Sequence, residues 1–121
     1  MEKDSNKFDL EERTAVFGEK VIDFTKKMQI NPINKPVITQ LIRSATSIGA
    51  NYLEADCAES KKDFIHKLSI CKKESKETKH WLRMIARISP EFKEEIKILW
   101  KETTELNLIF SAIINKMKKN K

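Results

Sequence analysis

Four stretches of the chain repeat apolar residues at alternating spacings of three and four, which is the period of one face of an α-helix. The first stretch predicts a helix over about 10–27, with Asp9 as its N-cap and Phe8 as a hydrophobic staple. The second predicts a helix that begins near Asn34 and Pro36, because a capping residue followed by proline is typical of a helix start. The core positions expected on these two helices are Leu10, Thr14, Phe17, Val21, Phe24, Met28, Ile38, Leu41, Ala45, Ile48, Tyr52 and Ala55.

The third and fourth stretches carry similar start signals. Ser60 and Asp63 form a capping-box pattern, and Ser89 followed by Pro90 predicts the start of the last helix. Four amphipathic helices with short connections predict an all-α, antiparallel, up-down-up-down four-helix bundle. An open array of helical hairpins is the alternative fold, although no internal repeat supports it. The core positions expected here are Phe64, Leu68, Cys71, Ser75, Thr78, Leu82, Ile85, Phe92, Ile96, Leu99, Thr103, Leu106, Phe110, Ile113 and Met117.

The composition agrees with a single helical domain over 1–121, in which we expect 1–8 and 117–121 to be flexible ends. Only two Gly and three Pro occur in 121 residues, so strands and their turns have little to build on. No apolar run reaches the roughly 18 residues that span a bilayer, and no signal segment stands at the N-terminus, so we expect a cytoplasmic protein without membrane contact. Cys57 and Cys71 are expected to remain thiols with packing roles.

The positive charge is concentrated on the third predicted helix. The chain has a formal net charge of +6, and 61–88 alone carry nine basic and three acidic residues. At about 100° per residue, eight of the basic residues fall on one flank of the helix. They are Lys61, Lys62, Lys72, Lys73, Lys76, Lys79, Arg83 and Arg87. Such a row suits the tracking of nucleic-acid phosphates, and Lys116, Lys118, Lys119 and Lys121 of the tail are candidates to extend it; a plain solvated face is the alternative.

The opposite flank of the third helix mixes acidic and apolar residues. We interpret it as a subunit interface, because a monomeric bundle should keep positions outside its core polar. The residues assigned to this interface are Ile70, Glu74, Glu77, Trp81, Met84 and Ile88. On the fourth helix Ile98, Trp100, Leu108 and Ile109 also fall outside the core stripe. Together these positions predict a homo-oligomer.

No catalytic, metal or cofactor site emerges from the motifs. Glu77 and His80 have the Glu-x-x-His spacing of di-iron bundles, but both project away from the core and no second copy exists to complete a pair. The sequence offers no glycine-rich phosphate loop, nucleophile elbow or Cys-x-x-Cys pair. We therefore expect a protein that is not an enzyme and that uses no cofactor or metal.

Polar residues on the second helix form a further feature. Arg43, Ser47 and Glu54 share one side, with Asn51 nearby, and their roles are left open. Acidic residues also crowd the C-terminal end of this helix, where the helix dipole disfavours anions. Glu54, Asp56 and Glu59 are therefore expected to have cationic partners, with a neighbouring subunit as one source.

Several segments resemble one protein family. Residues 40–55 (QLIRSATSIGANYLEA), 60–64 (SKKDF), 73–82 (KESKETKHWL) and 13–17 (RTAVF) are similar to the bacterial four-helix bundle proteins named for intervening sequences in 23S ribosomal RNA genes. His80 stands where an aromatic residue is more usual. The resemblance implies a homopentamer without catalytic residues. It also implies a distant kinship with the accessory proteins of diversity-generating retroelements, which bind nucleic acid and a reverse transcriptase.

Two functions follow from these observations. The first is a non-enzymatic, homo-oligomeric nucleic-acid-binding protein, with RNA favoured, that uses the basic flank of the third helix. The second is an oligomeric protein-interaction scaffold in which that flank serves solubility or pairs with the acidic flank of a neighbouring subunit. Exposure of the basic residues favours the first function, and their pairing favours the second.

Overall fold

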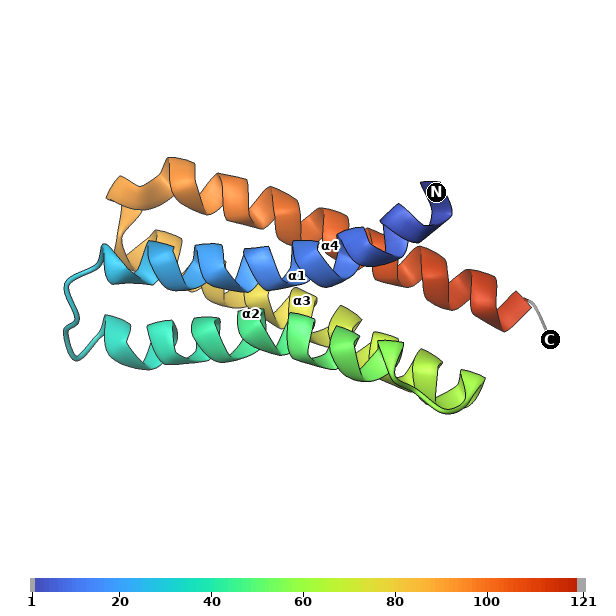
Figure 1. Cartoon of the computed structure of the whole chain (residues 1–121). Helices are drawn as coiled ribbons and strands as arrows, with labels where there is room; N and C mark the ends of the chain where they lie inside the picture. The colour runs from blue at the N-terminus through green and yellow to red at the C-terminus, as the bar shows by residue number, and fades with distance from the viewer. Residues whose placement is uncertain (1, 120–121) are drawn as a thin grey trace.

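The structure, a computed structural model, describes the backbone of residues 2–119 and the side chains of residues 10–119. It consists of four long helices and one short 3-10 turn. Figure 1 shows that each helix runs opposite to the one before it and that both chain ends lie at the same end of the molecule. The bounds are α1 Glu2–Lys26, α2 Asn34–Asp56, α3 Lys61–Ile88, η1 Pro90–Phe92 and α4 Lys93–Lys119. The predicted all-α, up-down-up-down four-helix bundle is confirmed. Among the described residues, no helix combines the length and the apolar character that crossing a membrane requires.

The start of α1 differs from the prediction. The helix begins at Glu2, so Asp9 lies inside it and is not its N-cap. No Gly or Pro stands between residue 2 and Asp9, so helix propensity allows the helix to extend towards the N-terminus. Most of the two ends that we expected to be flexible is helical, from Glu2 and up to Lys119, while residues 1, 120 and 121 lie outside the described part of the chain.

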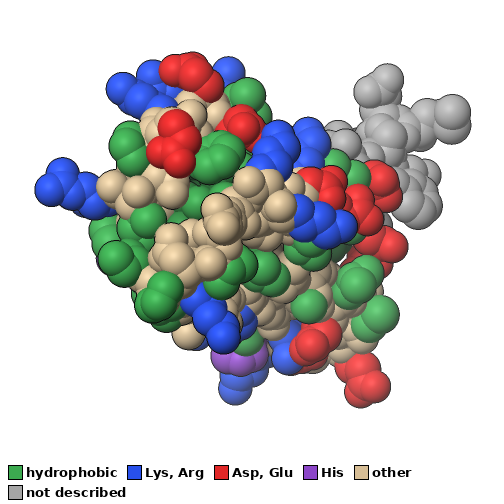
Figure 2. All heavy atoms as spheres, turned by 90° about the vertical axis from the view of Figure 1, so that its left-hand side faces the viewer, with side chains coloured by type: hydrophobic (Ala, Val, Ile, Leu, Met, Phe, Trp, Pro, Cys, Tyr) green, Lys and Arg blue, Asp and Glu red, His purple; other side chains and the backbone are tan. Residues whose placement is uncertain are grey.

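The loop before α2 is closed by two asparagines. The Oδ1 of Asn31 accepts the backbone N–H groups of Ile33 and Asn34 at 2.9 and 2.8 Å, so Asn31 performs the capping that we expected from Asn34. Asn34 is buried instead, and its side chain accepts from the Asn31 backbone and donates to the Gln29 carbonyl. This closed loop presents Ile30 and Ile33 to solvent at the end of the bundle seen in Figure 2, where hydrophobic side chains spread among charged ones.

The remaining helix starts follow the prediction more closely. The Ser60 hydroxyl accepts the Asp63 backbone N–H at 3.0 Å, which confirms Ser60 as the N-cap of α3. Ser89 begins a 3-10 turn that contains Pro90, and α4 starts only after this turn. Ser89 thus occupies the N-cap position of the 3-10 turn and not of α4, and its side chain makes no capping hydrogen bond.

The core follows the predicted stripes over most of their length. All predicted core positions of α1 and α2 are buried, and Phe64 and Phe92 are half-buried. Near the end of α4, Ile114 is buried in place of the predicted Ile113. A straight α-helix has 3.6 residues per turn and drifts about 20° per heptad from a strict seven-residue repeat, so a long register shifts by one residue near its end.

Polar groups in the core are satisfied by short contacts between neighbouring helices. The buried hydroxyls of Ser44 on α2 and Thr78 on α3 are hydrogen-bonded to each other at 2.9 Å. Helices α1 and α2 lie close together at Gly49, where a Cβ would contact the Thr14 carbonyl oxygen at 3.4 Å. Within the described residues, every buried side-chain nitrogen and oxygen has a hydrogen-bond partner.

The helices contact one another in a ring, with unequal closeness. α3 packs extensively against α2 and α4, and α1 packs on α2 but only lightly on α4. Arg13 joins the lightly packed pair through a bidentate contact with Glu102, at 2.7 and 2.9 Å, and a further bond to Glu105 at 2.9 Å. Helix α3 is thus central to the packing, with α2 on one of its sides and α4 on another.

Candidate nucleic-acid interface

The basic row predicted on α3 faces solvent. Seven of its eight residues are exposed and Lys79 is half-buried. The row begins at Lys61 and ends at Arg87, which at about 1.5 Å per residue is a length of about 39 Å. The sequence pattern therefore predicted correctly that these residues lie on a solvent-accessible side of α3.

Helix α4 packs against α3 beside this row. The Asn107 side chain donates to the Lys72 carbonyl at 3.0 Å and to the Ser75 hydroxyl at 2.8 Å. Closer to the turn between the two helices, the Lys79 ammonium lies 4.6 Å from the centroid of a Trp100 ring. Lys72, through its backbone carbonyl, and Lys79, through its ammonium, are thus in direct contact with side chains of α4.

The C-terminal end of α4 adds basic charge to the row. Lys118 and Met117 line a shallow pocket together with Lys61 and Lys62 at the start of α3. The prediction that the tail extends the row therefore holds for Lys118, whereas Lys121 lies outside the described residues.

The side of α4 that borders the row carries no charged residue from Trp100 up to Lys118. Its solvent-accessible residues recur at spacings of three and four, and within the described chain this set contains no carboxylate. They are Trp100, Thr104, Leu108, Ser111, Asn115 and Lys118. We use the name basic face for these residues together with the eight basic residues of α3. All charged residues of the basic face are cationic.

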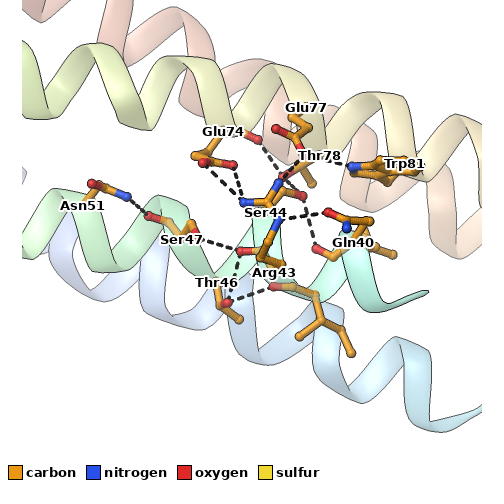
Figure 3. A network of polar contacts seen from close by, with 12 residues as sticks. Gln40, Arg43, Ser44, Thr46, Ser47, Asn51, Glu74, Glu77, Thr78 and Trp81 are labelled. Carbon is orange, nitrogen blue, oxygen red and sulfur yellow. Dashed lines mark hydrogen bonds and ion pairs between the residues drawn. The ribbon is translucent and has the colours of Figure 1, made fainter. Parts of the chain in front are cut away.

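The acidic flank of α3 is occupied by an arginine of α2 (Figure 3). Arg43 forms ion pairs with Glu74, at 3.4 Å, and with Glu77, and its Nε donates to the Gln40 side chain at 2.9 Å. The Trp81 indole N–H donates to the same Glu77 carboxylate at 3.2 Å. Glu74 is buried, so Arg43 compensates a carboxylate that has left water.

These contacts change the protonation behaviour of the cluster. The pKa of Glu77 lies below its ordinary value, chiefly because the Trp81 indole donates a hydrogen bond to its carboxylate. The hydrogen bond and the charge of Arg43 lower this pKa further, and together these interactions outweigh partial desolvation, which raises it. Desolvation lowers the pKa of Arg43, but the hydrogen bond to Glu77 and the two neighbouring carboxylates outweigh it and raise that pKa overall. Arg43 and Glu77 therefore both remain charged near neutral pH.

The predicted subunit-interface residues have partners within their own chain. Glu74 and Glu77 pair with Arg43, and Trp81 packs against the hydrophobic core. The other predicted interface residues are Ile70, Met84 and Ile88, and all three are half-buried. The acidic pair is thus already engaged by an arginine of its own chain, and the assignment of this flank to a subunit interface stays a prediction.

The acidic end of α2 also finds a partner inside the chain. Lys67 of α3 donates to Glu54 at 2.7 Å. The expected cationic partner of Glu54 is therefore in the same chain and not across a subunit boundary. The pairing depends on how α2 and α3 are aligned along their axes, which the sequence pattern of either helix alone does not show.

No grouping of the described residues suits a metal ion or a nucleophile. Three His, Cys, Asp or Glu side chains do not come together anywhere in this part of the chain. Glu77 is held by Arg43, and His80 is exposed with its ring against Trp81. Burial raises the pKa of the Cys71 thiol to about 12, which disfavours the reactive thiolate.

Trp100 is the residue of the basic face whose role sequence reasoning missed. Its off-core position on α4 was visible in the pattern, and 38% of it is exposed. Its closeness to Lys79 was not visible, because it depends on the alignment of α3 with α4. The charge count that identified the basic row also gives no information about an uncharged aromatic residue such as Trp100.

Comparisons with known proteins agree with this architecture. The family model described as 23S rRNA-intervening sequence protein matches residues 6–112. The chain is also similar to a protein of unknown function from the S23 ribosomal protein family of Bacteroides thetaiotaomicron, whose crystal structure it matches with a TM-score of 0.79 and 30% identity. That match covers 90% of this chain and 97% of the other. No match is found among curated proteins. The chain therefore belongs to the 23S rRNA-intervening sequence protein family.

Proposed function

We propose that this protein binds nucleic acid, with RNA as the favoured ligand, and does so without catalysing a reaction. The observation that carries the proposal is the basic face: seven exposed cationic side chains and the half-buried Lys79 follow one side of α3 beside a carboxylate-free side of α4. Lys and Arg in such a row release counterions from a phosphate backbone and do not read base sequence. Binding should therefore be tight at low salt, weak at high salt and nearly independent of sequence.

The state of the acidic flank supports this function over the scaffold alternative. A scaffold in which neighbouring copies pair their flanks needs free carboxylates to meet the lysines. Glu74 and Glu77 are instead paired with Arg43 of their own chain, and Glu74 is buried. These two carboxylates are therefore engaged within their own chain and are not free to meet the lysines of another copy.

The test compares two variants that have the same net charge. Reversal of Lys73, Lys76 and Arg83 to Glu removes three cations from the basic face, and each reversal lowers the charge by two, so the net charge falls from +6 to zero. Reversal of the exposed Lys20, Lys26 and Lys35 to Glu makes the same change in net charge outside that face, on α1 and α2. Circular dichroism verifies that both variants keep the helical fold.

Fluorescence anisotropy with labelled RNA and duplex DNA supplies the measurement, over about 50 to 200 mM salt. The variant of the basic face should lose most of its affinity, and for duplex DNA the slope of log affinity against log salt should fall by about three. The control variant should lose much less affinity and keep its slope. Absence of binding by the natural protein at the lowest salt, or equal losses in both variants, would refute the proposal.

Homo-oligomerisation is a second proposal, and exposed apolar residues favour it. Leu53, Ile98 and Leu108 are 50%, 66% and 63% exposed, respectively. Isolated apolar residues are common on surfaces, but three at this exposure on a small domain offer contact points for other copies of the chain. Light scattering coupled to size exclusion measures the assembly, and a monomer at all concentrations would exclude it.

A further inference from the structure

Trp100 gives the basic face a chemical selectivity that charge alone does not provide. Its indole lies within the face, 38% exposed, and one ring is approached by the Lys79 ammonium at 4.6 Å from the centroid. A cation at that distance is attracted to the aromatic ring, which favours this position of the indole. The side chain is thus an anchored aromatic surface among phosphate-binding groups.

Two further cations flank Lys79 on α3. Lys76 and Arg83 stand three residues before and four residues after Lys79, so their Cβ atoms lie about 5–6 Å from that of Lys79 on the same side of α3. Both are exposed. On α4, Thr104 follows Trp100 by one turn and carries no charge. A phosphate held by these cations therefore has a flat apolar ring beside it.

We infer that the basic face selects single-stranded nucleic acid over duplex by stacking an unpaired base on Trp100; this inference rests on the proposed function. Every base has a π-face that stacks on an indole, so the contact tolerates all sequences. In a duplex those faces are covered by neighbouring base pairs, and only base edges are reachable in the grooves. The basic face is the side of two packed helices, not one protruding helix, so it reaches duplex phosphates more readily than base edges.

The experiment measures the affinity of the full chain for a labelled oligouridylate of about 12 nucleotides and for an RNA duplex of the same length. Trp100→Ala should weaken single-strand binding by about ten-fold and leave duplex binding nearly unchanged. Trp100→Phe should recover part of the loss, because phenylalanine also stacks. Ile30→Ala, which removes an exposed apolar side chain in the loop between α1 and α2, outside the basic face, should change neither affinity.

A spectroscopic readout separates stacking from a general loss of affinity. The chain has two tryptophans, so Trp81→Phe leaves Trp100 as the emitter. Oligouridylate should quench that emission, and the duplex should not.

The outcomes distinguish this inference from the proposed function. If the protein binds both ligands but Trp100→Ala changes the two affinities equally or not at all, selection by stacking is wrong and nucleic-acid binding stands. If Trp100 emission is unchanged on saturation with oligouridylate, the inference fails in the same way. If neither ligand binds at low salt, both the inference and the proposed function fail.

Discussion

Replacing Arg43 by Met tests whether the ion pairs between α2 and α3 stabilise the bundle. Methionine keeps an apolar stem of similar length but removes the guanidinium from Glu74 and Glu77. Glu74, whose side chain is only 10% exposed, then remains as a buried carboxylate without its cation. The variant should therefore be less stable than the natural protein at neutral pH.

The expected loss lies between two known limits. Removal of one partner from a fully buried ion pair costs about 3–5 kcal/mol, and exposed pairs contribute about 0–1 kcal/mol. The Arg43 and Glu77 side chains are 43% and 33% exposed, so solvent screens part of the interaction. A loss of about 1–2 kcal/mol in unfolding free energy is expected, which lowers Tm by about 5 °C for a domain of this size.

The effect should disappear in acid. Because the pKa of Glu77 is held below its ordinary value, its contribution is complete above that ordinary value and is lost as pH falls through the lowered one. The unfolding free energy of the natural protein should fall between about pH 5 and pH 3. That of Arg43→Met should fall less, because the variant lacks the arginine that helps to lower the pKa of Glu77. The two curves of unfolding free energy against pH should converge at the acid end.

Urea denaturation followed by circular dichroism at several pH values supplies the data. Lys97→Met is the matched control, because Lys97 meets Glu94 at 3.9 Å with side chains 63% and 85% exposed and should contribute almost nothing. Addition of Glu74→Gln to Arg43→Met should restore part of the loss by removing the unpaired charge. A loss for Arg43→Met that is equal at pH 7 and in acid, or no larger than that of the control, would show that the carboxylates are not the cause.

Three further changes probe helix ends, helix packing and thiol burial. Ser60→Ala should cost about 1 kcal/mol by urea denaturation, because the α3 cap is lost, and Ser60→Asp should retain most of that stability. Gly18→Ala should stabilise by about 0.5–1 kcal/mol, since its Cβ would meet Thr46 at an ordinary 3.5 Å; a lowered Tm would contradict this reading. A thiol reagent should modify the exposed Cys57 quickly and the buried Cys71 only after unfolding, and rapid titration of both thiols in the folded protein would show that the core opens.

The fold and the basic row were predictable because both follow from the period of a single helix. Once α3 is known to bury Leu68 and Leu82, the directions of Lys72 and Arg83 follow at about 100° per residue. The Ser60 cap was readable for the same reason, since its partner is only three residues away. Local geometry of this kind needs no knowledge of the neighbouring helices.

Features that join two helices were not predictable. The contact of Arg43 with Glu74 links residues 31 positions apart and depends on the axial alignment of α2 with α3. The contact of Lys79 with Trp100 depends in the same way on α3 and α4. Asp9 was misread because a residue that favours a cap also tolerates a place inside a helix. Asp9 could either cap a helix or lie inside one, and the start of α1 at Glu2 places it inside.

Under the proposed function, the one-sided charge of the α3–α4 side also orients the molecule as it approaches a polyanion. A body whose positive charge is displaced to one side has a large dipole moment, and a polyanion exerts a torque on it before the surfaces touch. At physiological ionic strength this field extends about 8 Å into solvent, which is enough to turn α3 towards the ligand during the last stage of diffusion. Collisions in the wrong orientation are thereby reduced. Added salt should then slow association through the loss of orientation, in addition to weakening the bound complex.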